Sequence, residues 1–115
     1  MLLFNSMVEL TADSLDLLFH ALADGTRRSI IKRIASKSLS VSEIARPFRM
    51  SLAAVSKHLK VLERAGLIRR EKQGTTYLMS LNAEALLSAE EWLAHYRQYW
   101  EGRLDALQNL LEKEQ

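Results

Sequence analysis

The stretch 51–67, SLAAVSKHLKVLERAGL, carries small, hydroxyl and basic side chains at helical spacing. Val55, Leu59 and Leu62 recur at intervals of three and four and predict the apolar stripe of a helix, whose first turn Ser51 can cap. The other faces are small or basic, which suits contacts to the base edges and phosphates of double-stranded DNA. A solvated amphipathic helix would show the same pattern, so the neighbouring segments must decide. The candidate DNA-contacting residues here are Ser51, Ala53, Ser56, Lys57, His58 and Lys60.

Basic residues are concentrated in the middle of this 115-residue chain. Between Arg27 and Lys72 there are thirteen Lys or Arg against three Asp or Glu, whereas the rest holds three basic and eleven acidic residues, for a net charge of +2. Such a basic region is typical of a surface that binds a polyanion. On charge alone, a merely solvated surface is the alternative.

The chain offers little that a catalytic site needs. It has no cysteine, which excludes disulfides and thiolate metal sites. The three histidines, His20, His58 and His95, fall on separate predicted helices, and there is neither a nucleophile elbow nor a glycine-rich phosphate loop. We therefore expect no enzyme activity, no catalytic residues, no metal and no cofactor.

No membrane segment or signal peptide is predicted. No apolar run approaches the roughly 20 residues that span a bilayer, and the opening MLLFNSM lacks the basic leader of a signal peptide. The sequence therefore predicts a cytoplasmic protein. Met1 and Met7 are both candidates for the native start.

Two short helices are predicted near the beginning of the chain. The first starts at Asp13, its expected cap, and has apolar residues at spacings of three and four. Asp24-Gly25-Thr26 breaks this helix and caps a second one, which ends near Ser36. Arg27 and Arg28 at the start of the second helix fit either phosphate binding or an ion pair with a nearby aspartate.

A helix-turn-helix is predicted in the basic region. Ser40-Val41-Ser42-Glu43 is a capping box and should start a third helix, and Pro47 should end or bend it because proline removes a backbone hydrogen bond. A short connection then leads into the helix of about 51–65. Two short helices joined by a tight turn, the second with a basic face, form a helix-turn-helix, although other helical hairpins share this pattern.

A β-hairpin is predicted directly after this helix, over about 67–81. Segments 67–73 and 76–81 suit antiparallel strands, and Gly74-Thr75 suits the turn between them. A basic hairpin in this position is the wing of a winged helix-turn-helix. The alternative is an exposed hairpin whose edge charges prevent association. The wing residues expected to contact DNA are Arg69, Arg70, Lys72, Thr75 and Thr76.

The last segment, about 83–112, has the pattern of one long helix that Asn82 can cap. Its apolar stripe is longer than one small domain can cover, so part of it should pack against another subunit. A stripe that only closes the chain's own core is the alternative. The stripe contains Ala89, Leu93, Tyr96, Trp100, Leu104, Leu107 and Leu111, flanked by Trp92 and Tyr99.

Together these segments predict a mainly α fold with a small β-hairpin. It is a single winged helix-turn-helix domain over 1–115, with a recognition helix about 51–65, a wing about 67–81 and a C-terminal dimerisation helix about 83–112. The predicted function is sequence-specific DNA binding by a transcriptional regulator. The alternative is a protein-interaction module that uses the aromatic C-terminal helix without specific DNA binding.

Three ordered motifs resemble the ArsR/SmtB family of bacterial transcriptional repressors. The run 19–28, FHALADGTRR, resembles the family's F-x-A-L-[AS]-D-P-T-R-R signature, with Gly25 in place of proline. The run 54–67 is similar to its A-V-S-x-H-L-x-x-L-x-x-A-G-L recognition segment, and 70–77 resembles its wing. The resemblance implies a homodimeric repressor of a palindromic operator, with the terminal helices at the interface. The interface residues expected are Leu15, Phe19, Trp92, Tyr96, Trp100, Leu104, Leu107 and Leu111.

The known metal sites of that family are not matched. Where its metal-sensing members carry a Cys-x-Cys box, this chain has Ser-Val-Ser-Glu at 40–43, with hydroxyls where a soft metal needs thiolate. His95 stands on the last helix with Glu91 one turn earlier and no second histidine. The resemblance therefore implies a member without either metal site, and the effector is unknown.

Overall fold

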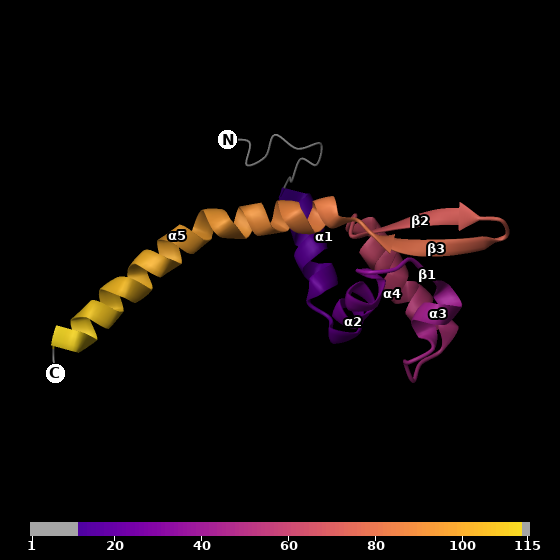
Figure 1. The fold of residues 1–115 in the computed structure, drawn as a ribbon, viewed down its shortest axis with the longest axis horizontal. Coiled ribbons are helices and arrows are strands. Elements are labelled where there is room, and N and C mark those ends of the chain that lie inside the picture. Colours follow the sequence, from indigo (N-terminus) through magenta and orange to yellow (C-terminus); the bar gives the residue numbers. More distant parts are fainter. Residues whose placement is uncertain (1–11, 114–115) are drawn as a thin grey trace.

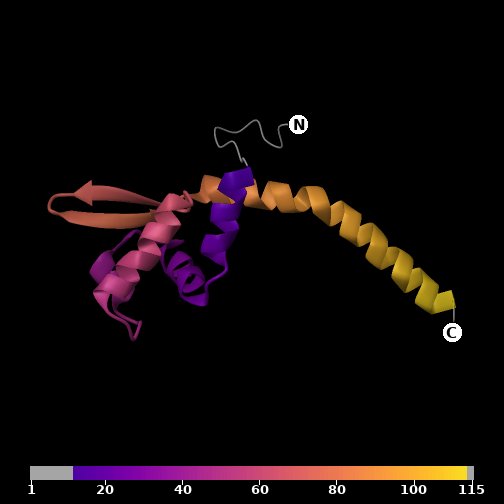
Figure 2. The ribbon, with the colours of Figure 1, turned by 180° about the vertical axis from the view of Figure 1, so that it is seen from behind.

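The helices α2, α3 and α4 and a small sheet gather at one end of the molecule, and α5 extends away from them (Figures 1 and 2). The computed structural model describes residues 12–113, apart from the side chains of 12, 13, 98–100 and 104. The molecule measures 65 × 35 × 23 Å along its principal axes. The elements are α1 (Ala12–Leu22), α2 (Gly25–Ile34), β1 (Leu39–Ser40), α3 (Val41–Ala45), α4 (Leu52–Arg64), β2 (Ile68–Gln73), β3 (Thr76–Leu81) and α5 (Ala83–Lys113).

Asp24 forms the corner between α1 and α2. Its side chain accepts the backbone N–H of Arg27 at 3.0 Å, so the predicted cap of α2 is confirmed. The prediction that Asp13 caps α1 is wrong, because α1 already includes Ala12.

The capping box at the start of α3 is present as predicted. The Ser40 N–H donates to Oε1 of Glu43 at 3.0 Å, and the Glu43 N–H donates to Oγ of Ser40 at 3.2 Å. From α2, Nη2 of Arg33 donates to the Glu43 carbonyl at 2.9 Å. The helix ends at Ala45, two residues before Pro47, as expected for a residue that cannot donate a backbone hydrogen bond.

Both ends of α4 are defined by side chains and turns that the sequence indicates. The Oγ of Ser51 accepts a first-turn N–H at 3.1 Å. At the other end Gly66 has a φ of 76°, the left-handed conformation that glycine adopts without strain. The N–H groups of Gly66 and Leu67 donate to the carbonyls of Glu63 and Leu62, both at 3.0 Å, which is a Schellman motif.

The sheet has three antiparallel strands in the order β1-β3-β2. The predicted hairpin is confirmed: β2 pairs with β3 so that Arg70 faces Met79, and Gly74 supplies a φ of 63° in the turn. The strand β1 was not predicted. It is two residues long and exists only because Leu39 and Ser40 pair with β3.

One hydrophobic core holds the recognition helix against α1, α2, α3 and the sheet. It consists of apolar side chains that are almost completely buried, and replacing any large one by alanine should cost about 2–5 kcal/mol. The largest are Leu18, Ile30, Ile34, Ile44, Val55, Leu59, Leu62, Leu67 and Met79.

The long helix α5 joins this core through its first turns, where Ala85, Ser88 and Ala89 are buried. Asn82 directly precedes α5, and its side chain also bonds back to the end of α4. Its Nδ2 donates to the Gly66 carbonyl at 2.8 Å, because the turn that ends α4 leaves this carbonyl close to the start of α5. This bond ties the recognition helix to the base of α5.

Candidate nucleic-acid interface

The side of α4 opposite the core presents small, hydroxyl and basic side chains to solvent. Ser51, Ala53, Lys57 and Lys60 are exposed, and Ser56 is half-buried. Since the buried stripe occupies one side of the helix, Ala53, Ser56, Lys57 and Lys60 must lie on the other sides, whereas Ser51 is exposed as the cap that precedes the helix. These five residues are called the outer face of α4 below, and all five belong to the predicted set.

His58 differs from the other predicted residues of α4 because its ring faces α2. Its Nδ1 lies 3.3 Å from Nη1 of Arg27 and 3.9 Å from Oδ2 of Asp24, and its side chain is 23% exposed. Arginine can only donate, so the bond to Arg27 requires Nδ1 of His58 to accept, with the ring proton on Nε2. The structure therefore places His58 at the joint between α4 and the α1–α2 corner, away from the outer face.

The guanidinium groups of Arg27 and Arg28 cap the C-terminal end of α1. Arg27 donates from Nε to the carbonyl of Ala21 at 2.8 Å and from Nη2 to that of His20 at 2.9 Å. Arg28 donates from Nη1 to the carbonyl of Leu22 at 2.8 Å. The last carbonyls of a helix have no partner within it. Capping of α1 is thus a third role, different from the phosphate binding and the ion pair considered from the sequence.

The wing carries two of its basic residues on the side of α4. Arg70 and Lys72 lie 5.4 and 5.9 Å from the ring centroid of Tyr77, close enough for cation–π attraction. Arg70 also pairs with Glu63 of α4 at 2.7 Å. This pair connects the wing directly to the recognition helix.

Arg69 lies on the other face of the wing, because successive side chains of a strand alternate. Its Nη2 is 4.0 Å from Oε2 of Glu84 in α5, and both side chains are about half exposed, so the pair is weak. Thr75 and Thr76 are exposed at the tip. The structure therefore brings all five predicted wing residues onto one hairpin but not onto one face of it.

Three carboxylates, those of Asp24, Glu43 and Glu63, are engaged within the fold. A backbone N–H donated at a helix cap lowers the pKa of Asp24 below its ordinary value of 3.8, and in the same way lowers that of Glu43 below 4.5. Glu63 is paired with the wing. Among the described residues no carboxylate forms an ion pair with Lys57 or Lys60, so the outer face of α4 keeps its positive charge.

Three exposed residues next to the outer face were missed in the sequence. Leu52 is 55% exposed at the first position of α4. Arg46 and Arg49 are exposed in the connection between α3 and α4. A signal was available for Arg49, because it falls within the predicted connection 49–51, whereas Arg46 fell within the predicted third helix.

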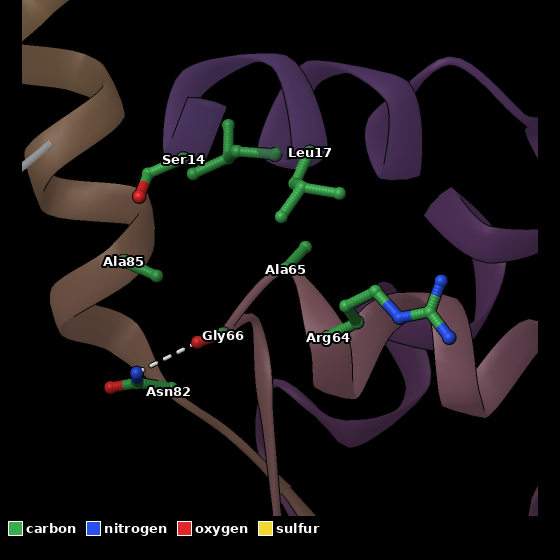
Figure 3. Close-up of a pocket in the computed structure, with 8 residues that line it drawn as sticks. Ser14, Leu17, Arg64, Ala65, Gly66, Asn82 and Ala85 are labelled. Carbon is green, nitrogen blue, oxygen red and sulfur yellow. Dashed lines mark hydrogen bonds between the residues drawn. The ribbon is translucent and has the colours of Figure 1, made fainter. Parts of the chain in front are cut away.

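A cavity of about 310 Å³ lies at the base of α5, away from the outer face of α4. Figure 3 shows Leu17 reaching toward it from α1, Ala65 from the end of α4 and Ala85 from α5. The hydrogen bond from Asn82 to Gly66 borders this cavity (Figure 3). Its remaining lining residues are Ser14, Leu18 and Arg64.

Part of the predicted dimer face lies where α1 packs against α5. Phe19 packs against Trp92 with ring centroids 5.5 Å apart, Trp92 packs against Tyr96 at 4.8 Å, and Leu15 is half-buried beside them. Tyr96 is 46% exposed. Further along α5, Leu107 and Leu111 are exposed, and the side chains of Trp100 and Leu104 lie outside the described residues.

Two negative findings apply to the part of the chain that the structure describes. No three His, Asp or Glu side chains in it come together as a metal ion would require. No helix in it has both the length and the apolar character to cross a membrane.

Residues 22–71 match a family described as a helix-turn-helix domain. The chain is 38% identical over 104 residues to the HTH-type transcriptional regulator Rv2034 of Mycobacterium tuberculosis, covering 90% of this chain and 94% of the relative. It is 30% identical over 78 residues to the transcriptional repressor SdpR of Bacillus subtilis, covering 68% and 87%.

Two solved structures show the same arrangement. An ArsR family transcriptional regulator, RHA00566, has a TM-score of 0.74 at 37% identity, over 82% of this chain and 97% of that one. The homodimeric winged helix-turn-helix DNA-binding domain Mb0332 from Mycobacterium bovis, a possible ArsR-family regulator, has a TM-score of 0.60 at 28% identity, over 75% and 82%.

The fold defines a winged helix-turn-helix protein. The predicted fold class is confirmed. The identity and coverage of the relatives place the chain in the ArsR family of transcriptional regulators, as its three motifs indicated.

Proposed function

We propose that the protein is a homodimeric repressor that binds a palindromic operator and acts in the cytoplasm. The observation that carries the proposal is the outer face of α4, where Ala53, Lys57 and Lys60 are exposed and Ser56 is half-buried. This face lies beside a basic wing, and no carboxylate of the described residues pairs with its lysines. A helix of this kind fits the major groove with its N-terminal residues toward the bases.

The side chains divide into two groups by what they can contact. Ser56 and Lys57 are placed to hydrogen-bond base edges, and Ala53 can touch a thymine methyl group. His58 keeps α4 in position through Arg27. The residues assigned to phosphate and sugar are Ser51, Lys60, Arg69, Arg70, Lys72, Thr75 and Thr76, to which the exposed Arg49 is added.

Dimerisation is supported by the apolar outer side of α5. Leu107, Leu110 and Leu111 are 52, 59 and 54% exposed, at spacings of three and four on a helix that leaves the core. A second copy would cover them, and Mb0332 is described as homodimeric. The two recognition helices would then read half-sites about 34 Å apart, one helical turn of DNA. The sense of regulation is taken from SdpR, a repressor.

The division of roles is tested by comparing Lys57→Ala with Lys72→Ala. Lys57→Ala should weaken binding to the preferred operator by about 1–3 kcal/mol and relax the choice of base at one position. Lys72→Ala should weaken all sequences alike and lower the slope of log affinity against log salt by about one. Fluorescence anisotropy on operator and random duplexes at several salt concentrations measures both.

Identical effects of the two changes on operator and random DNA would refute the assignment. If the wild-type protein shows no preference for any duplex selected from genomic DNA, the alternative of a protein-interaction module that uses the exposed leucines of α5 replaces the proposal.

A further inference from the structure

Leu52 is a large apolar side chain exposed in the basic part of the molecule. Outside α5, the described large apolar residues with high exposure are Leu17, Leu52 and Tyr77. Leu17 lines the cavity at the base of α5, and the Tyr77 ring lies under Arg70 and Lys72. Leu52, 55% exposed, has neither kind of neighbour among the described contacts.

Exposure alone does not distinguish Leu52, because single exposed leucines are common on protein surfaces. Its position does. It is the first residue of α4, directly after the Ser51 cap, and Ser56 follows it by one turn on the same side of the helix. The N-terminal turn of a recognition helix is the part that approaches the base edges.

The residue types around Leu52 limit how that turn can read DNA. Residues 51–57, SLAAVSK, contain no Asn or Gln, the side chains that pair with both major-groove groups of adenine. Lys57 can serve guanine. The Ser56 hydroxyl can bond to either kind of base pair and so distinguishes them poorly. The feature that marks an A·T pair for an apolar side chain is the thymine C5-methyl group.

We propose that Leu52, with Ala53 beside it, reads thymine methyl groups in each operator half-site. The inference rests on the proposed function, since it requires α4 to lie in the major groove. It adds a specificity-determining residue and a sequence feature: each half-site holds a thymine whose methyl group packs against Leu52.

The test uses a duplex selected from a random library by the full-length wild-type protein. Each thymine is replaced in turn by deoxyuridine, which removes only the methyl group. At one or two positions per half-site the wild-type protein should lose about fourfold in affinity, equivalent to about 0.8 kcal/mol for one buried methyl group. Leu52→Ala should bind the thymine duplex about fourfold more weakly and no longer distinguish thymine from deoxyuridine there.

Leu87→Ala is the matched control, because Leu87 is 54% exposed on α5. It should keep the wild-type ratio of affinities for thymine and deoxyuridine, whatever its effect on overall binding. Circular dichroism verifies that both variants are folded, as expected for changes at exposed positions.

Three results would overturn the role of Leu52 and leave operator binding intact: selected half-sites without thymine, no position sensitive to deoxyuridine, or a sensitive position at which Leu52→Ala still discriminates as the wild type does. A wild-type protein that binds the selected duplex no better than a random one would instead overturn the proposed function, and this inference with it.

Discussion

Asp24 stands at the corner between α1 and α2, where its side chain caps α2. Its carboxylate accepts the Arg27 N–H at 3.0 Å and lies 3.9 Å from Nδ1 of His58 on the recognition helix. The hydrogen bond from Arg27 lowers the pKa of Asp24 below 3.8. The folded state therefore binds this proton less readily than the unfolded chain does. The contribution of Asp24 to stability is complete above about pH 4 and is lost as the pH falls through the lowered pKa.

Replacing Asp24 by Asn should separate the contribution of the helix cap to stability from that of the carboxylate charge. Asparagine caps a helix about as well as aspartate, so Asp24→Asn should have nearly wild-type stability at low pH. Because the variant lacks the titrating carboxylate, the stability advantage of the wild type should shrink as the pH falls from about 5 to 2. Urea unfolding at a series of pH values measures this difference.

Ser51→Ala provides the comparison, since it removes a cap without a titratable group. It should cost about 1 kcal/mol at every pH. If the difference between the wild type and Asp24→Asn were equally independent of pH, the linkage assigned to Asp24 would be wrong.

Local residue patterns predicted most caps correctly and side-chain partners across the fold poorly. Asp24, Ser51 and the Ser40–Glu43 box act on N–H groups three residues away, so their roles are encoded in short spacing. The guanidinium group of Arg27 reaches carbonyls six and seven residues back and a histidine 31 residues ahead. Only the packing of α1, α2 and α4 brings these groups together.

At the scale of elements, the α1–α2 corner holds the recognition helix through Arg27. Its planar fork donates to the carbonyls of Ala21 and His20 and to His58 of α4 at the same time. A lysine at this position keeps the charge but not the fork. The corner thus requires the geometry of arginine.

Arg27→Lys should therefore destabilise the protein by about 1–3 kcal/mol, since it leaves part-buried acceptors without partners. Lys32→Ala, an exposed change in the same helix, should alter the free energy of unfolding by less than about 0.5 kcal/mol. Chemical denaturation of both variants measures the difference. Equal stability of the two variants would show that the bonds of Arg27 do not hold the corner.

Elements with strong local signals were predicted, and the element without one was not. The α4 helix and the hairpin β2–β3 have apolar periodicity, caps and a glycine turn. The strand β1 has two residues and depends on Met79, forty residues later, so no local pattern could reveal it. Arg69 and Arg70 point to opposite faces of the hairpin because successive side chains of a strand alternate, although both were predicted to contact DNA.

On the scale of the whole molecule, α5 is much longer than the part of it that packs against the core. Its 31 residues span about 46 Å, whereas its buried residues lie in its first turns. Figure 1 shows the rest of the helix projecting away from the other helices and the sheet. The sequence predicted this long apolar stripe. It could not show how little of the stripe the chain's own core covers, because that depends on the direction in which α5 leaves the core.

A charge on the exposed stripe of α5 tests whether a second copy covers it. Leu107→Glu should raise the dimer dissociation constant at least about tenfold, because the carboxylate would lose its hydration at the interface. Asn109→Glu is the control: Asn109 lies about 200° around the helix from Leu107, so it should leave the dimer unchanged. Sedimentation equilibrium gives both constants, and operator affinity should fall only for Leu107→Glu, since a monomer contacts one half-site. An unchanged dimer in Leu107→Glu would mean that the distal part of α5 faces solvent or another partner, and that the subunits meet nearer to Phe19 and Trp92.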